Sequence, residues 1–371
     1  MSLYETVTKR DERALYELRS LYRRYGYAQY KMSKFEEYDL YVRNKSFLLS
    51  DHVITFTDTD GKLMALKPDV TLSIVKNSRD KTDGVRKVYY NENVYRVPKG
   101  EISFREIMQT GLECIGNIDA YCIAEVLILA AKSLAVLSPD YVLDISHLGV
   151  VSTLIDRLGV SEEVRQQMLY CVGEKNPHGI DGICRAEGLD PEAASLLKRL
   201  MTADGDCDRT LALLREADCG EAAAELGAIL SAVRESVSPE RIRLDFSVVN
   251  DMNYYNGIVF SGFVNGVPTS ILSGGQYDNL MRKMGKRSGA IGFAVYLDLL
   301  DRLYDENESY DADVVVVYES DAEAVTVCRE VSRLTEEGNR VAVRRTVPTK
   351  MRYKTLIKVK NGEVSVVETH A

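Results

Sequence analysis

The sequence predicts an α+β fold in which an antiparallel sheet is flanked by helices. Residues 85–96 and 105–116 alternate in the manner of two strands of an antiparallel hairpin. Residues 120–137 are almost uniformly apolar, which is typical of a helix inside a protein core. Residues 152–237 are rich in Ala, Leu, Glu and Arg, which predicts a separate group of helices.

These patterns divide the chain into three parts. Residues 1–151 and 239–305 are expected to form one core, which a helical insertion at residues 152–238 interrupts. The polar segment DENESYDAD then leads into residues 310–371. There, a strand, a helix, a second strand and a closing β-rich segment predict a small α/β domain.

The first half of the core begins with a helix from about Asp11 to Tyr27, for which Gly26 is the stop signal. The turn signal TDTDG then lies among short β-rich pieces within residues 54–66, which favours a hairpin. The apolar helix at residues 120–137 is too short and too interrupted by polar residues to predict a membrane span.

In the second half, strand character resumes at residues 241–250 and continues to residue 272, with NGVP as a hairpin turn. Residues 273–284 then enter a helix, and residues 289–305 run from a strand into a helix.

Composition narrows the function classes. The chain has 371 residues, a charged start and no apolar run of membrane-spanning length, so we expect a cytoplasmic protein without a membrane partner. Its seven cysteines and four histidines lack metal-ligand spacing, so we expect reduced thiols, no metal and no other cofactor. The net charge of -9 argues against a general nucleic-acid binder, because a phosphate-binding surface needs clustered Lys and Arg.

Four separated motifs contain the polar residues of interest: ALKPDVT at 65–71, NVYRVPKG at 93–100 with FREIMQTGLECIG at 104–116, VVNDMNYYNGIVFSGF at 248–263, and SGGQYDNL at 273–280 with GAIGFAVYLDLL at 289–300. Alone, the first is also consistent with a proline turn closed by an Asx hydrogen bond, and the second with a surface strand of alternating charges. On one strand, residues two and four apart share a face, so Arg105, Gln109 and Glu113 are predicted to line one cavity.

Together, the motifs resemble the histidyl-tRNA synthetase family over nearly all of residues 11–303. The resemblance implies a class II aminoacyl-tRNA synthetase-like core. It also implies a candidate histidine-binding set: Asp69, Thr71, Arg96, Gln109, Glu113, Tyr254 and Tyr255. Asp69 and Thr71 would hold the ligand's ammonium group, since a buried ammonium needs a carboxylate and acceptor oxygens. Arg96 and Arg105 would correspond to the family's acyl-phosphate and ATP contacts.

The sequence departs from the family on the nucleotide side of the site. Asn250, Gln276 and Leu299 stand where the family has arginines, and Tyr296 stands where it has a glycine. Neutral side chains cannot stabilise charge that develops on a carboxylate and a phosphate, and a phenol ring fills space that a nucleotide needs. The resemblance therefore implies an amino-acid pocket with degenerate adenylation positions and no catalytic residue.

Regulatory subunits of ATP phosphoribosyltransferase are relatives of this kind. The resemblance implies a non-catalytic partner of a short-form catalytic subunit in the first step of histidine biosynthesis, with histidine as an effector. It also implies a homodimer within a hetero-oligomer. Residues 310–371 resemble a truncated anticodon-binding domain, which makes a tRNA partner unexpected. The alternatives are a divergent histidyl-tRNA synthetase and another synthetase-like amino-acid-binding paralogue.

Overall fold

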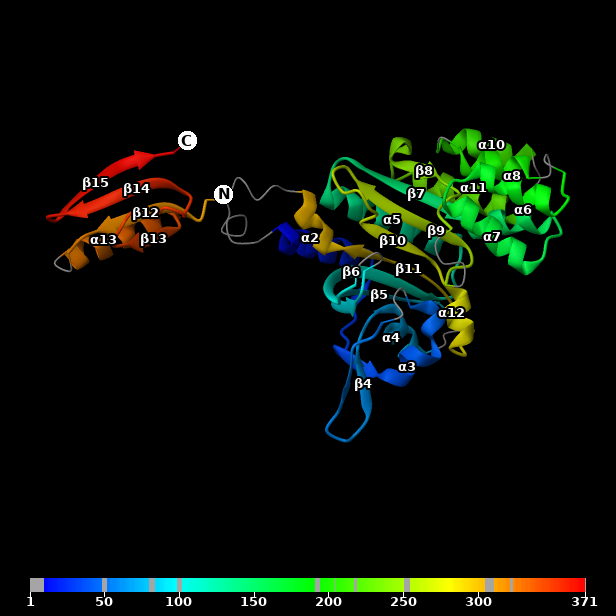
Figure 1. The fold of residues 1–371 in the computed structure, drawn as a ribbon, viewed down its shortest axis with the longest axis horizontal. Helices are drawn as coiled ribbons and strands as arrows, with labels where there is room; N and C mark the ends of the chain where they lie inside the picture. Colours follow the sequence, from blue (N-terminus) through cyan, green and yellow to red (C-terminus); the bar gives the residue numbers. More distant parts are fainter. Residues whose placement is uncertain are drawn as a thin grey trace. The chain divides into compact units, whose positions relative to one another are not determined.

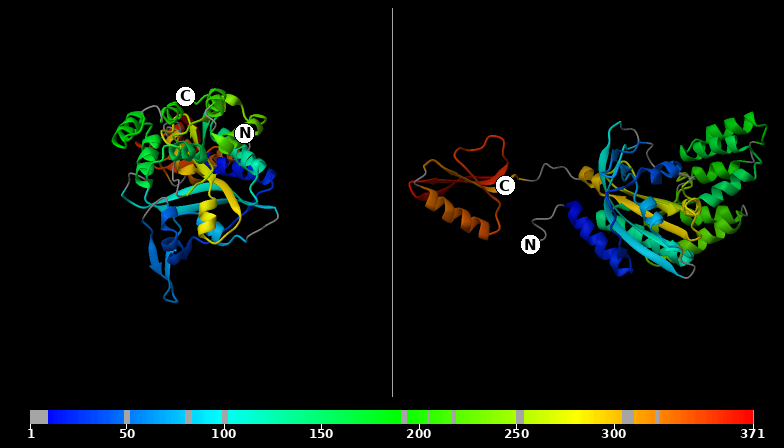
Figure 2. Two further views of the ribbon diagram at one scale, coloured as in Figure 1. Left: turned by 90° about the vertical axis from the view of Figure 1, so that its right-hand side faces the viewer. Right: turned by 90° about the horizontal axis from the view of Figure 1, so that it is seen from below.

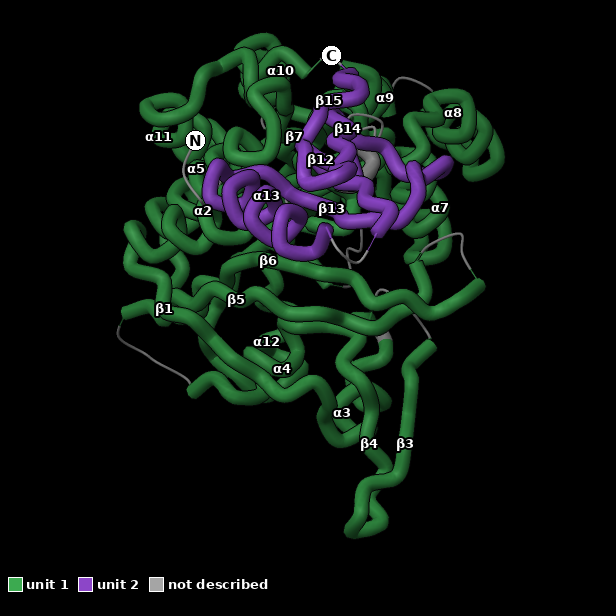
Figure 3. The backbone as a smooth tube through the Cα atoms, turned by 90° about the vertical axis from the view of Figure 1, so that its left-hand side faces the viewer, with its two compact units in different colours: residues 1–303 green, residues 304–371 purple. Residues whose placement is uncertain are grey.

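The structure is a computed structural model. It describes residues 10–48, 52–79, 84–98, 102–190, 194–203, 205–216, 219–249, 254–303, 310–320 and 323–370, so the candidate position Asn250 lies outside the described residues. The chain forms two compact units, residues 1–303 and residues 304–371, which are distinguished by colour in Figure 3. Each unit is described by itself.

The first unit is built on an eight-stranded sheet with the order β1-β5-β6-β11-β10-β9-β7-β8. Its strands are β1 (Ala28–Gln29), β5 (Val85–Arg96), β6 (Arg105–Gly116), β7 (Tyr141–His147), β8 (Ile242–Leu244), β9 (Ile258–Val264), β10 (Leu272–Gln276) and β11 (Gly289–Tyr296). Only the end pairs β1–β5 and β7–β8 are parallel, and every other described pair is antiparallel. The predicted antiparallel sheet and its β5–β6 hairpin are confirmed.

Helices cover both faces of this sheet (Figure 1). One face packs against α2 (Arg10–Arg24) and α5 (Ala120–Leu137), and the other faces α3 (Tyr38–Arg43), α4 (Thr71–Lys76) and α12 (Asp278–Lys283). Side chains alternate along a strand, so Leu112 of β6 enters the α5 core while Glu113 faces the α4 side. Among the described residues, α5 alone has the length and composition of a membrane span, and 67% of it is buried, as in a core helix.

The residues predicted as a helical insertion lie beside β7 and β8 (Figure 2). They contain the second half of α6 (Leu148–Asp156), which begins before the predicted boundary at residue 152. They also contain α7 (Glu162–Gly173), α8 (Pro177–Ala186), α9 (Ser195–Met201), α10 (Cys207–Glu216) and α11 (Gly220–Arg234). Two of the 3₁₀ turns of this unit, η2 (Pro239–Arg241) and η3 (Leu297–Leu303), follow α11 and β11 respectively. Apolar residues of the insertion join the same core as α2 and α5, so the insertion is packed onto the sheet domain.

The second unit is a four-stranded sheet with the order β13-β12-β14-β15. It contains β12 (Ala312–Tyr318), α13 (Ala324–Glu336), β13 (Val341–Arg344), β14 (Tyr353–Lys360) and β15 (Glu363–Thr369). Val327 and Leu334 of α13 pack against one face of the sheet. Asn361 and Gly362 have φ values of 52° and 79°, and such a pair of left-handed residues is what a two-residue hairpin turn requires.

A small three-stranded sheet supports the turn that leads into α4. Its strands are β2 (Phe35–Glu37), β3 (Thr55–Thr57) and β4 (Leu63–Leu66), and the turn η1 (Lys45–Phe47) lies between β2 and β3. Lys67 follows β4 and is 0% exposed. Its Nζ lies 2.5 Å from Oε2 of Glu92, and its carbonyl accepts a hydrogen bond of 2.9 Å from the N–H of Tyr95. These bonds fasten the turn to β5.

Replacing Lys67 by Met is expected to destabilise the first unit by about 3 kcal/mol, because Glu92 would keep a largely buried charge without its partner. Urea denaturation followed by circular dichroism measures this free energy of unfolding. The double variant Lys67→Met/Glu92→Leu is the control, and it is expected to recover most of the loss because no unpaired charge remains. Equal stability of the wild type and Lys67→Met would contradict this account of the turn.

Candidate functional site

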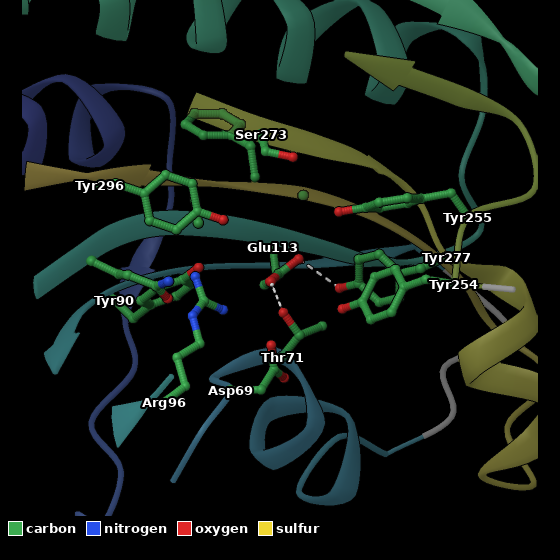
Figure 4. Close-up of a pocket in the computed structure, with 14 residues that line it drawn as sticks. Asp69, Thr71, Tyr90, Arg96, Glu113, Tyr254, Tyr255, Ser273, Tyr277 and Tyr296 are labelled. Atoms are coloured by element: carbon green, nitrogen blue, oxygen red, sulfur yellow. Dashed lines mark hydrogen bonds between the residues drawn. The ribbon is translucent and has the colours of Figure 1, made fainter. Parts of the chain in front are cut away.

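One cavity in the first unit brings together residues of all four motifs (Figure 4). It lies on the α4 side of the main sheet and has a volume of about 50 Å³. All seven candidates for histidine binding line it: Asp69, Thr71, Arg96, Gln109, Glu113, Tyr254 and Tyr255. The remaining wall residues are Tyr90, Ser273, Tyr277, Gly292, Phe293, Ala294 and Tyr296.

Glu113 lies at the centre of the cavity and is 2% exposed. The hydroxyl of Tyr277 donates a hydrogen bond of 2.6 Å to its Oε2, and the hydroxyl of Thr71 donates one of 2.9 Å to its Oε1. Gly292 of β11 is its cross-strand partner, and a Cβ at Gly292 would collide with the carboxyl group. The carboxyl therefore occupies a space that only a glycine on the neighbouring strand leaves open.

The surroundings of Glu113 favour its neutral form. Burial raises its pKa to about 8, because the protein replaces the water that would stabilise the charge. The hydrogen bonds from Tyr277 and Thr71 oppose this rise, and the nearby Asp69 adds to it. A cationic group that enters the cavity would favour the ionised form of Glu113, so the empty site holds a proton that such a ligand can displace.

Asp69 lies at the start of α4, beside Glu113. Its Oδ1 accepts a hydrogen bond of 2.8 Å from the N–H of Leu72, so the turn does contain the bond expected of a capped proline turn. Asp69 lines the cavity as well. Burial raises its pKa, while the Leu72 N–H and the Arg96 guanidinium oppose the rise. Asp69 therefore both caps the turn before α4 and faces the cavity in which a ligand would bind.

Arg96 is the one cation among the residues that line the cavity, and it is 8% exposed. Its Cζ lies 5.5 Å from the ring centroid of Tyr296, which is within the range of a cation–π interaction. Figure 4 shows both side chains at the same end of the cavity.

Three tyrosines form the opposite end of the cavity (Figure 4). The ring of Tyr254 lies 4.6 Å from that of Tyr255 and 5.8 Å from that of Tyr277, measured between centroids. Burial raises the pKa values of Tyr254 and Tyr277 well above their usual value, so both remain neutral phenols. This end suits a flat ligand ring with a polar atom, because it offers aromatic faces together with hydroxyl groups.

Some expected residues lie outside this cavity. Arg105 shares a strand face with Gln109 but does not line the wall, which corrects the prediction that Arg105, Gln109 and Glu113 line one cavity. Four residues of a strand span about 13 Å, so Arg105 lies beyond the end of the cavity. Gln276 does not line it either: its Oε1 accepts a hydrogen bond of 2.7 Å from the N–H of Ile258. Leu299 packs against the core on the α5 side.

Sequence reasoning overlooked Tyr277 and Gly292, although both belong to quoted motifs. Tyr277 follows directly after Gln276, and its hydroxyl binds the central carboxyl. A signal was available for Gly292, since a glycine inside a strand often marks a close approach by another group. That signal does not identify Glu113 as the group approached, because β6 and β11 are far apart in the sequence.

Replacing Glu113 by Gln is expected to remove a pH dependence of stability. Folding raises the pKa of Glu113 from about 4.5 to about 8. The contribution of Glu113 to the free energy of unfolding is therefore fully present below pH 4.5 and is lost as the pH rises through 8. In this window the wild type should lose up to about 1.4 kcal/mol of unfolding free energy per pH unit relative to the variant.

Urea denaturation at pH 5 and pH 8 measures this difference, and Glu187→Gln is the matched control because Glu187 is exposed. If the difference between the wild type and Glu113→Gln were the same at both pH values, Glu113 would have an ordinary pKa in the folded protein.

Comparison with known proteins supports a family assignment. The family model of histidyl-tRNA synthetase matches residues 2–300. An ATP phosphoribosyltransferase regulatory subunit from Caldanaerobacter subterraneus subsp. tengcongensis is 30% identical over 288 residues, which cover 76% of this chain and 75% of the relative. A protein of the same description from Oceanobacillus iheyensis is 25% identical over 334 residues, covering 87% and 81%.

Solved structures share the fold. The ATP phosphoribosyltransferase regulatory subunit/histidyl-tRNA synthetase from Bacillus halodurans has a TM-score of 0.72 at 23% identity, covering 95% of each chain. Histidyl-tRNA synthetase from Nostoc sp. PCC 7120 has a TM-score of 0.70 at 19% identity, covering 96% of this chain and 93% of that chain. Both likenesses confirm the class II synthetase-like fold. The chain belongs to the histidyl-tRNA synthetase family, and the relatives that are 30% and 25% identical to it are named ATP phosphoribosyltransferase regulatory subunits.

Proposed function

We propose that this chain is the regulatory subunit of an ATP phosphoribosyltransferase, required together with a short catalytic subunit for the first step of histidine biosynthesis in the cytoplasm. The main support for this proposal is the regulatory subunit that is 30% identical to this chain and is matched over three quarters of its length. A second support is a chain of the ATP phosphoribosyl transferase (HisG:HisZ) complex from Thermotoga maritima, with a TM-score of 0.62 at 18% identity, covering 77% of this chain and 97% of that chain. The chain would act as a homodimer within the complex.

The proposed effector is histidine, bound in the cavity around Glu113. The single observation that supports this choice is the division of the cavity into three chemically distinct parts (Figure 4). Asp69, Thr71 and Glu113 supply acceptors for a cationic group. Arg96 supplies a fork of N–H donors for a carboxylate, and the tyrosine end supplies flat surfaces for an imidazole.

Histidine would regulate the complex by binding one of its states more tightly than another. A coupling free energy between two such sites is commonly about 1 to 3 kcal/mol, which corresponds to roughly a 5- to 150-fold change in affinity. The chain itself would have no catalytic residue. By the resemblance described above, the neutral residues Asn250, Gln276 and Leu299 would stand where the family has arginines, so the proposed subunit would not form an adenylate.

A divergent histidyl-tRNA synthetase is the second candidate. The match of the synthetase family model to residues 2–300, together with the amino-acid-like cavity, favours it. It differs from the first candidate in its chemistry, because a synthetase forms histidyl-adenylate from ATP without any partner chain.

The two candidates are separated by an activity assay with the short catalytic subunit of the same organism. Phosphoribosyltransferase activity is expected only when this chain is added, and it is expected to fall as histidine is titrated in. The control is ATP–pyrophosphate exchange with this chain alone and histidine, in which no exchange is expected. No stimulation of the catalytic subunit, combined with histidine-dependent exchange, would establish the synthetase instead.

Replacing Asp69 by Asn is expected to weaken inhibition by histidine without loss of activation. Asn keeps an oxygen for the Leu72 N–H but removes the charge that faces the ammonium group. Loss of one charged hydrogen bond costs about 1.5 to 3 kcal/mol, so the histidine concentration for half inhibition should rise about tenfold or more.

The matched control is Asp60→Asn, in an exposed hairpin turn, which should leave both quantities unchanged. Unaltered inhibition in Asp69→Asn would place the effector elsewhere, whereas a loss of activation would assign Asp69 to the assembly of the complex.

A further inference from the structure

We propose that the outer edge of β15, in the second unit, binds the same edge of a second copy of this chain. The two strands pair antiparallel about Ser365, which joins two four-stranded sheets into one continuous sheet. This inference concerns the second unit alone, so it does not depend on the proposed use of the cavity in the first unit.

β15 is an edge strand that the second unit leaves uncovered. It lies beside β14 at one edge of the sheet, and β14 is the one described strand with which it pairs (Figure 1). All seven residues of β15 are exposed. The free side of an edge strand presents backbone N–H and C=O groups that can pair with another strand. The edge of β15 is therefore available to a further strand.

The side chains of this strand are unusually apolar for a free edge. Val364, Val366 and Val367 are 43%, 63% and 54% exposed. Val364 opposes Val359 of β14, and Val366 opposes Ile357. Opposed residues share a face of the sheet, and Val359 and Ile357 belong to the core beneath α13. Val364 and Val366 therefore extend this apolar face by one strand, beyond the part that α13 covers.

The opposite edge of the sheet has the features that prevent pairing. β13 forms that edge. Arg340 precedes β13, Arg344 ends it and Arg345 follows it. Charged side chains protect an edge strand from other chains, and two copies of β13 would bring positive charges together. The contrast between the two edges of one small sheet favours β15 as the edge that pairs.

The sequence of β15 is complementary to itself in the antiparallel direction. Val364, Ser365 and Val366 read the same from either end, so pairing about Ser365 places Val364 of each copy opposite Val366 of the other. Glu363 then opposes Val367, and no like charges meet. A parallel pairing in register would place Glu363 against Glu363, which is unfavourable. A two-fold interface requires such a self-complementary surface, so a second copy is the occupant that fits this edge.

A bulge sets the extent of the pairing. Leu356 of β14 opposes Glu368 and Ile357 opposes Val366, so Val367 is an extra residue of β15. The regular part of the strand is residues 363–366, which contains the whole self-complementary run. The interface is therefore short, and cross-linking suits its detection because a covalent bond traps the paired state.

Disulfide trapping in the full chain tests both the pairing and its register. Ser365→Cys is made in a Cys328→Ser background, because Cys328 is exposed and the other six cysteines are buried. Directly opposed residues of antiparallel strands have Cα atoms about 4.5 to 5.5 Å apart, within the range that a disulfide spans. The oxidant diamide should therefore couple two copies through the new thiols, and a non-reducing gel measures the covalent dimer.

Val364→Cys in the same background is the matched control. In the proposed pairing, the two copies of position 364 are offset by about 7 Å along the strand, which is too far for a disulfide. The yield of covalent dimer should be at least about tenfold higher for Ser365→Cys than for Val364→Cys. Adding Val366→Glu to Ser365→Cys should lower the yield roughly fivefold, because both pairs of valines are lost.

Equal yields from Ser365→Cys and Val364→Cys would overturn the proposal, since random collisions do not depend on register. Absence of a dimer from Ser365→Cys would overturn it as well. A dimer that disappears when the short catalytic subunit is added would also contradict it, because the edge of β15 would then bind that subunit.

Discussion

The buried carboxyl of Glu113 is the constraint on which the rest of the site depends. It lies on the central sheet, beneath a turn that contributes Thr71 and a helix start that contributes Tyr277. Its position requires a glycine at 292 on the neighbouring strand. A carboxyl so enclosed has an unfavourable charge in the empty protein, which is why its pKa is raised to about 8. A cationic ligand that meets this carboxyl would favour its ionised form and displace its proton.

Much of this fold was predictable because its signals are local. The β5–β6 hairpin coincides with the predicted residues 85–96 and 105–116, and α5 coincides with residues 120–137. The alternation of side chains on β6 also placed Gln109 and Glu113 on one face correctly. Where the cavity ends along that strand was not predictable, so Arg105 was wrongly expected in its wall. The position of the cavity's end depends on strands that are distant from β6 in the sequence.

The candidate site was predictable only in part, for the same reason. All seven nominated binding residues line the cavity, since they fall in motifs that the family resemblance identifies. Tyr277 and Gly292 were missed because their role depends on contact with Glu113. Glu113 precedes Tyr277 by more than 160 residues in the sequence. Gln276, nominated beside Tyr277, instead fastens β10 to the start of β9. Neighbours in the sequence thus take separate roles because successive residues of an extended chain point in opposite directions.

The proton on Glu113 offers the most direct test of this account. Histidine should be titrated calorimetrically into the full chain at pH 7, in two buffers with different enthalpies of ionisation. If the ligand's cationic group meets Glu113, binding should release most of one proton per site, and Glu113→Gln should release almost none, since the pKa of about 8 leaves Glu113 mainly protonated in the empty cavity. Binding of histidine with the same heat in both buffers would contradict the account.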